Sequence, residues 1–168
     1  MYKHKKKGAK GVPGMKQGRC PYCGSHIVLR SADGIYKDNT AGTMLYVCSK
    51  YPACDAYVRA QPRTRKPVGS LANGTLRILR QETHQYFDRL YLTGIMSRSE
   101  AYEWLAWVLK IPLSQAHIGF LGEYYCRRVI EECKGLLENR RVVQAGWRDG
   151  HIRNLKRASG DGIYAATI

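Results

Sequence analysis

Two short runs of apolar and β-branched residues near the start of the chain predict a pair of β-strands. They read HIVLR and MLYVC, and the segment between them contains the turn-forming pairs DG and AG. Short runs of this composition, separated by glycine-containing turns, are typical of antiparallel hairpins. We therefore expect a β-hairpin between about residues 26 and 48.

From residue 73 onward the apolar positions recur every three or four residues, which is the period of an amphipathic helix. The pattern predicts a helix over residues 73–92, with Gly94 as its stop signal. The inward stripe of this helix comprises Leu76, Leu79, Arg80, Thr83, Tyr86, Phe87, Leu90 and Tyr91.

Two further helices follow the first. Ser97 and Glu100 have the spacing of a capping box, in which each side chain accepts a hydrogen bond from a free backbone amide. The short helix after them carries Trp104 and Trp107 on one face, where we expect core packing or, for one of the two, a place capping the bundle. A third helix is predicted over residues 121–138, with inward side chains at Tyr125, Val129, Ile130, Cys133 and Leu137. Three helices with short connections predict a small bundle.

The segments outside these elements are rich in basic residues and glycine. Residues 1–19 have no hydrophobic periodicity and predict a flexible arm. Residues 60–70 contain two prolines and several bases and predict an extended linker. Residues 140–168 contain a DG turn that favours a hairpin, followed by a polar tail. The fold class is therefore α+β, with a ribbon at residues 20–59 and a helical bundle at residues 71–139.

Four of the six cysteines flank the predicted hairpin. Cys20 and Cys23 lie in CPYCG, and Cys48 and Cys54 lie in CSKYPAC. A structural zinc needs four thiolates at about 2.3 Å, which two tight turns at the ends of a hairpin can supply. This spacing predicts one structural Zn²⁺ held by the four cysteines, with no open coordination position for catalysis.

Disulfides and a redox pair are the alternatives for these cysteines. A redox CxxC stands at the start of a helix beside a βαβ unit, whereas this one opens a hairpin. Disulfides need an oxidising compartment, and the chain shows no secretion signal. A second metal site built from His117, Cys126 and Cys133 would lack a fourth ligand, so buried free thiols are favoured there.

The residues of the ribbon carry a resemblance to a known family. CPYCG, the VLR triplet and CSKYPAC resemble the C-terminal four-cysteine zinc ribbons of bacterial type IA DNA topoisomerases. In those enzymes the ribbons bind single-stranded DNA, which implies the same role here for Arg30, Tyr46, Lys50, Tyr51 and Tyr57. A longer stretch, residues 18–133, is similar to a phage and prophage family of zinc-finger-containing proteins with no named activity.

The charge of the chain is large and unevenly distributed. The net charge is +15; residues 1–19 hold seven bases and residues 59–80 hold six, both without an acid, whereas residues 81–139 are slightly acidic. Segregated positive charge is typical of proteins that bind phosphate backbones, although basic tails also serve solubility. The candidate nucleic-acid contacts are Lys5, Lys6, Lys7, Lys16, Arg19, Arg30, Tyr46, Lys50, Tyr51, Tyr57, Arg59, Arg63, Arg65 and Lys66. We expect about half of Tyr36, Tyr46, Tyr51 and Tyr57 to be exposed, because alternate residues of a hairpin face opposite sides.

No catalytic motif stands out in the chain, and no apolar run is long enough to cross a bilayer. His84 and Asp88 lie one helical turn apart, but without a nucleophile or metal motif they favour a structural or surface pair, and a small nuclease is the weakest hypothesis. The sequence predicts a non-enzymatic nucleic-acid-binding protein located in the cytoplasm. The resemblance to the phage and prophage family implies a phage or mobile-element origin and a bacterial host. The alternative is an adaptor or inhibitor that docks on a larger nucleic-acid enzyme, such as a polymerase or nuclease.

Overall fold

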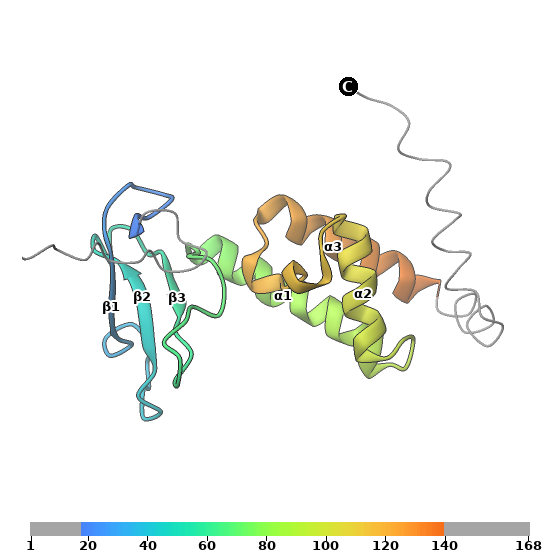
Figure 1. Ribbon diagram of the computed structural model, residues 1–168, viewed down its shortest axis with the longest axis horizontal. Helices are drawn as coiled ribbons and strands as arrows, with labels where there is room; N and C mark the ends of the chain where they lie inside the picture. Colours follow the sequence, from blue (N-terminus) through green and yellow to red (C-terminus); the bar gives the residue numbers. More distant parts are fainter. Residues whose placement is uncertain (1–17, 140–168) are drawn as a thin grey trace, which may run out of the picture.

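The computed structural model describes residues 18–139 and places a small sheet at one end and three helices at the other (Figure 1). Helix α1 leads from the sheet into the helical bundle. The predicted arm, apart from its last two residues, and the predicted C-terminal hairpin lie outside the described residues. The elements are β1 Ile27–Ser31, β2 Met44–Cys48, β3 Tyr57–Arg59, α1 Gly74–Leu92, α2 Arg98–Leu109 and α3 Glu123–Glu138.

The sheet is antiparallel, with the order β1-β2-β3. Strands β1 and β2 form the predicted hairpin, with Val28 opposite Val47. Strand β3, which the sequence did not predict, pairs with the other edge of β2. Leu45 and Val47 are fully buried and pack against Ala32 on one face of the sheet. The predicted hairpin is therefore confirmed and extended by one strand.

Residues 60–70 fold back on the end of the sheet, so the prediction of an extended linker is wrong. The amide of Gln61 donates to the carbonyl of Lys66 at 2.7 Å, and the amide of Val68 donates to the carbonyl of Arg59 at 2.9 Å. Arg65 closes this turn with a positive φ of 54°. The reversal satisfies backbone groups at the outer edge of β3, which an extended linker would leave unpaired.

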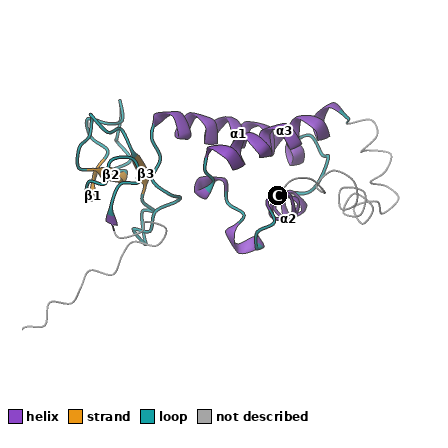
Figure 2. Ribbon diagram, turned by 90° about the horizontal axis from the view of Figure 1, so that it is seen from above, coloured by secondary structure: helices purple, strands orange, loops and turns teal. Residues whose placement is uncertain are grey.

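Two of the three predicted helix starts are confirmed. The Asn73 side chain accepts a hydrogen bond from the amide of Leu76 at 2.9 Å and caps α1. At the start of α2, Ser97 and Glu100 form the reciprocal capping box. Helices α1 and α3 lie side by side in the bundle (Figure 2), and their facing side chains form the larger hydrophobic core.

Two aromatic side chains of the bundle lie outside the core where we expected them inside. Helix α3 begins at Glu123, two residues after the predicted start, and its buried stripe comprises Cys126, Val129, Ile130 and Cys133. Tyr125 stands at the edge of this stripe and is exposed. Trp107 is also exposed, whereas Trp104 packs against the core. The core-facing side of α2 carries Ala101, Leu105, Val108 and Leu109, and at 100° per residue Trp107 lies roughly opposite this side.

The sheet and the bundle meet through a close backbone contact. The amide of Ser70 donates to the carbonyl of Gly119 at 2.9 Å. A Cβ atom at Gly69 would collide with the same Gly119 carbonyl, so only glycine permits this approach. The buried Arg80 of α1 donates to the carbonyls of Ser70 and Leu121, each at 2.9 Å, and so joins both segments to the helix.

None of the helices within residues 18–139 combines the length and apolar character needed to cross a membrane.

Candidate metal centre

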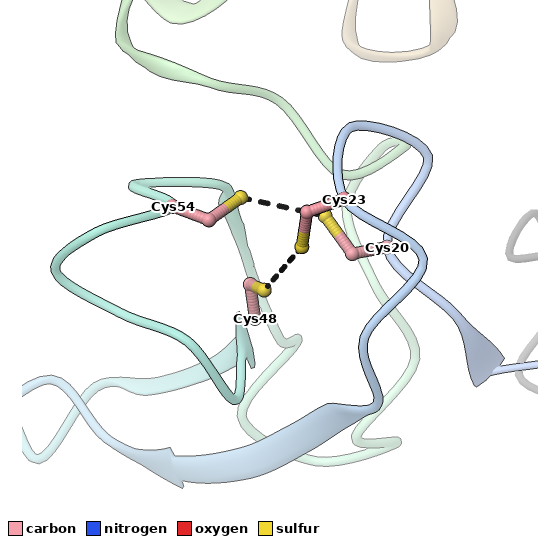
Figure 3. Close-up of side chains that lie close together, drawn as sticks. All are labelled: Cys20, Cys23, Cys48 and Cys54. Atoms are coloured by element: carbon pink, nitrogen blue, oxygen red, sulfur yellow. Dashed lines mark hydrogen bonds between the residues drawn. The ribbon is translucent and has the colours of Figure 1, made fainter.

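The sulfur atoms of Cys20, Cys23, Cys48 and Cys54 converge at one end of the sheet (Figure 3). All four Sγ atoms lie within 4.8 Å of one another, with 3.6 Å between Cys20 and Cys54 and 3.3 Å between Cys23 and Cys48. A tetrahedral zinc with Zn–S bonds of about 2.3 Å separates its sulfurs by about 3.8 Å. The four thiols are free. The arrangement is therefore consistent with one structural zinc, as the sequence predicted.

Two short turns aim the thiols at the common centre. In the first, the amide of Gly24 donates to the carbonyl of Cys20 at 2.9 Å, and Gly24 adopts a φ of 71° that favours glycine. In the second, the amide of Cys54 donates to the carbonyl of Lys50 at 3.1 Å. These turns stand where the sequence placed the two cysteine pairs, one before β1 and one after β2.

The four thiols differ in their surroundings. Hydrogen bonds from Ser25 lower the pKa of the exposed Cys23 to about 6. Burial raises the pKa of Cys48 to about 12 and also raises that of Cys54. Cys23 therefore has a lower pKa than Cys48 and Cys54, and it is the most exposed corner of the site. Zinc binding draws all four ligands into the thiolate form and releases their protons.

Asp55, the residue directly after the last cysteine, connects the metal centre to the helical bundle. Its carboxylate accepts a hydrogen bond from the amide of Gly74 at 2.7 Å, at the N-terminus of α1. Arg77 of the same helix reaches back to that carboxylate at 3.2 Å and to the Asp55 carbonyl at 2.7 Å. A negative charge at a helix N-terminus is favourable because it satisfies free amides and opposes the helix dipole. The sequence analysis missed this link, since nothing local marks Asp55 as a cap for a helix 19 residues away.

Replacing Asp55 with alanine is expected to lower the free energy of unfolding by about 1–2 kcal/mol, which is the usual effect of losing a helix cap. Zinc content should remain at the parental value, because Asp55 is not one of the four clustered ligands. Asp55→Asn keeps an acceptor without the charge, so its free energy of unfolding should lie between those of the parent and Asp55→Ala. Urea denaturation and metal analysis measure both quantities.

Glu103→Ala, at an exposed acid of α2, is the matched control and should change stability by less than about 0.5 kcal/mol. If Asp55→Ala and this control were equally stable, the link between the metal centre and α1 would contribute nothing to the free energy of unfolding.

The ribbon tyrosines are less available than expected. Tyr36, Tyr46, Tyr51 and Tyr57 are all half-buried, so the expectation that about half of them are exposed is wrong. Their rings and hydroxyls have partners inside the molecule. The Arg77 guanidinium lies 3.7 Å from the centre of the Tyr57 ring, and the Tyr46 hydroxyl donates to the carbonyl of Arg65 at 2.8 Å.

The aromatic side chain that does face solvent at the metal centre is Tyr22, which the sequence analysis did not select. It lies in the turn between Cys20 and Cys23 and is 43% exposed. The available signal was its position, because a residue between two ligands of a tight turn points away from the metal. Tyr51 keeps one partner, with the Arg30 guanidinium 5.5 Å from its ring centre.

The predicted basic contacts in the described residues all lie at the surface. The exposed set on the sheet and on the segment that folds back comprises Arg19, Arg30, Lys50, Arg59, Arg63, Arg65 and Lys66. Arg19 also donates to the carbonyl of Gly24 at 3.0 Å, beside the first cysteine turn. Lys5, Lys6, Lys7 and Lys16 lie outside the described residues.

The other candidate sites do not form a second metal centre. Cys126 and Cys133 are fully buried in the bundle, where burial raises the pKa of Cys133 to about 12, whereas His117 is exposed. Between residues 18 and 139, the four ribbon cysteines form the one cluster of three or more potential ligands. His84 and Asp88 form the expected pair, with 3.9 Å between Nδ1 and the carboxylate.

Comparison with known proteins agrees with this geometry. The family described as a zinc-finger-containing domain matches residues 16–136, which include the ribbon and nearly all of the bundle. No curated protein and no solved structure matches the chain. Because the match covers more than half of its length, the chain belongs to the family of zinc-finger-containing domains.

Proposed function

We propose that this protein binds nucleic acid, DNA or RNA, through its zinc ribbon and without catalysis. We infer that it is encoded by a phage or mobile element. The observation that carries the proposal is the exposed basic set on the sheet and on the segment that folds back. Its members beyond the first cysteine turn are Arg30, Lys50, Arg59, Arg63, Arg65 and Lys66. Exposed basic side chains are the electrostatic requirement for contact with a phosphate backbone.

The folding back of residues 60–70 supports the proposal. The backbone around Arg63 and Lys66 is held by the Gln61–Lys66 hydrogen bond and by the contact between Tyr46 and Arg65. Bases on an ordered backbone lose less conformational entropy on binding than the same bases on an extended linker. The turn thus presents its charges in a fixed direction at the Met44 end of the sheet, away from the cysteines.

Unstacked bases have two candidate partners in the ribbon. Tyr22 is exposed, and the half-buried Tyr51 lies beside the Arg30 guanidinium. Stacking on an aromatic side chain contributes about 1–3 kcal/mol per base with little sequence preference. Binding of single-stranded or distorted nucleic acid, with low sequence specificity, fits this combination of rings and bases.

The triple variant Arg63→Gln/Arg65→Gln/Lys66→Gln tests the contact surface. We expect it to weaken binding of every oligonucleotide to a similar degree and to lower the slope of log Kd against log salt by about 2, because two or three phosphate contacts are lost. Fluorescence anisotropy across salt concentrations, with single- and double-stranded DNA and RNA, measures both effects.

A matched control removes three exposed bases from the helices, as Arg89→Gln/Arg98→Gln/Arg127→Gln. It changes the net charge by the same amount and should retain most of the affinity. Equal losses in the two triple variants would show that only net charge matters, and the assignment of the ribbon surface would be wrong.

A second candidate, an adaptor that docks on a larger nucleic-acid enzyme, is favoured by apolar side chains on the helices. Ile78, Leu92 and Tyr124 are 67%, 75% and 69% exposed. Aromatic residues such as Tyr124 are enriched at protein interfaces. Capture experiments after nuclease treatment separate the candidates, because an adaptor keeps its partner when the nucleic acid has been digested.

A further inference from the structure

A cleft of about 610 Å³ lies where the sheet meets the bundle. Its volume falls in the range of about 300–1,000 Å³ that is typical of small-ligand sites. Residues from both the sheet end and the bundle line it. The basic and aromatic side chains among them are Arg59, Lys66, His84, Tyr102, His117 and Phe120. The cleft is separate from the metal centre, because none of the four cysteines lines it.

One wall of the cleft is cationic. Arg59 ends β3 and Lys66 stands in the segment that folds back, and both side chains are exposed. Gln61 adds an amide to the same wall. The residues that line the cleft in the described part of the chain include no Asp or Glu. Asp88, which does not line it, pairs with the lining residue His84 at 3.9 Å. This wall suits a phosphate group rather than a cation.

The opposite wall is aromatic. Tyr102 packs edge-on against the buried Phe87, with 5.2 Å between ring centres, and against His117 at 6.1 Å. These contacts fix the orientation of the Tyr102 ring. Phe120 reaches the same wall from the short 3-10 helix Ile118–Phe120 and is 44% exposed. The exposed Phe120 ring and the half-buried Tyr102 ring, across from the cationic wall, provide a stacking surface for a planar heterocycle.

The floor of the cleft is a fixed piece of backbone. Val68 and Gly119 line it, and they belong to the two segments joined by the bond from Ser70 to Gly119 at 2.9 Å. The buried Arg80 holds these segments from behind through the carbonyls of Ser70 and Leu121. A preformed cleft loses little entropy when a ligand binds.

We propose that this cleft binds a phosphorylated nucleoside, with the phosphate against Arg59 and Lys66 and the base against Phe120 and Tyr102. The ligand is either a free nucleotide or one unstacked nucleotide of a bound strand. For a nucleotide of a bound strand, this inference rests on the proposed function. It deepens that function, because Arg59 and Lys66 belong both to the exposed basic set and to the cleft. The cleft adds the helical bundle to a contact surface otherwise confined to the ribbon.

Titration of the zinc-loaded full chain with adenosine 5′-monophosphate, followed by ¹H–¹⁵N NMR, tests the site. We expect shifts at the amides of Gly119 and Phe120, weaker binding of adenosine and of inorganic phosphate than of the nucleotide, and loss of about fivefold or more in affinity for Phe120→Ala. Tyr124→Ala, which removes an exposed ring from α3 outside the cleft, should bind like the parent. Equal nucleotide affinity of Phe120→Ala and the parent would overturn the proposal.

A single-stranded oligonucleotide without a terminal phosphate separates the two sources. If it displaces the mononucleotide and Phe120→Ala weakens its binding, a nucleotide of the strand occupies the cleft. If the mononucleotide binds and the oligonucleotide does not displace it, the cleft takes free nucleotides. Binding of the oligonucleotide with unchanged affinity in Phe120→Ala, and no binding of the mononucleotide, would overturn the cleft proposal while leaving the proposed function intact. Binding of the mononucleotide without binding of any oligonucleotide would overturn the proposed function while leaving the cleft proposal intact.

Discussion

Replacing Cys48 with serine is expected to abolish zinc binding and to unfold the sheet end of the molecule. Cys48 is 1% exposed, and its sulfur lies 3.3 Å from that of Cys23 at the centre of the cluster. A structural zinc contributes about 10–16 kcal/mol of apparent binding energy near neutral pH, far more than the small apolar clusters of a three-stranded sheet can replace. Metal analysis should give one zinc per chain for the parent and less than about 0.1 for Cys48→Ser.

Cys133→Ala is the matched control for this experiment. Cys133 is equally buried, but it lies in the bundle and outside the cluster of potential ligands. Its zinc content should equal that of the parent, even if its stability falls through loss of packing. A zinc content of two per chain for the parent, or one that Cys48→Ser leaves unchanged, would contradict the assignment of the metal centre.

The bundle should keep its helices when the metal is lost. Its hydrophobic core draws on α1, α2 and α3 and does not depend on side chains from the strands. We therefore expect Cys48→Ser to retain most of its helical circular dichroism while the amide resonances of β2 lose their dispersion. Two separate transitions, one sensitive to chelator and one not, should appear in denaturation of the parent.

Replacing Arg80 with methionine is expected to lower the free energy of unfolding by about 2–4 kcal/mol. The guanidinium donates to the carbonyls of Leu121 and Ser70 and, at 2.6 Å, to the hydroxyl of Ser70. Methionine keeps the apolar stem but leaves these oxygens without their donors. Burial lowers the pKa of Arg80. Its partners are neutral oxygen atoms that accept hydrogen bonds, so the role of the guanidinium is to donate to them.

The control for this variant is Arg127→Met, at an exposed position of α3, which should change stability by less than about 0.5 kcal/mol. Arg80→Lys should fall between the parent and Arg80→Met, because an ammonium group cannot reach both segments in the planar geometry of a guanidinium. Urea denaturation measures the whole series. If Arg80→Met were as stable as the parent, Arg80 would not be the residue that joins the sheet to the bundle.

The features that the sequence predicted well are those with a local chemical signature. Two cysteine pairs around β-rich runs predicted the metal centre, and the spacing of Ser97 and Glu100 predicted the start of α2. In each case the interacting groups lie within a few residues of one another, or the metal chemistry itself dictates that they converge. The exposed bases were predictable for a similar reason, since charge seldom enters a small core.

The features that could not be predicted depend on contacts between distant residues. Strand β3 has only three residues and forms because β2 offers a free edge. Arg80 occupies an apolar stripe, and its role becomes visible only when Ser70 and Leu121 meet beside it. The burial of Tyr57 likewise follows from Arg77, which arrives from a helix that begins 17 residues later. No local sequence pattern specifies these long-range contacts.

The segment that folds back also determines where the protein can be divided. Tyr57 pairs with Ala72, Ala60 pairs with Pro67, and Leu71 packs into the cluster of Cys20 and Cys48. A fragment that ends at residue 59, the predicted end of the ribbon, would expose the outer edge of β3 and lose part of its core. An autonomous ribbon fragment must therefore extend to the first turn of α1, so that the shortest metal-binding unit of this chain already includes the beginning of its helical half.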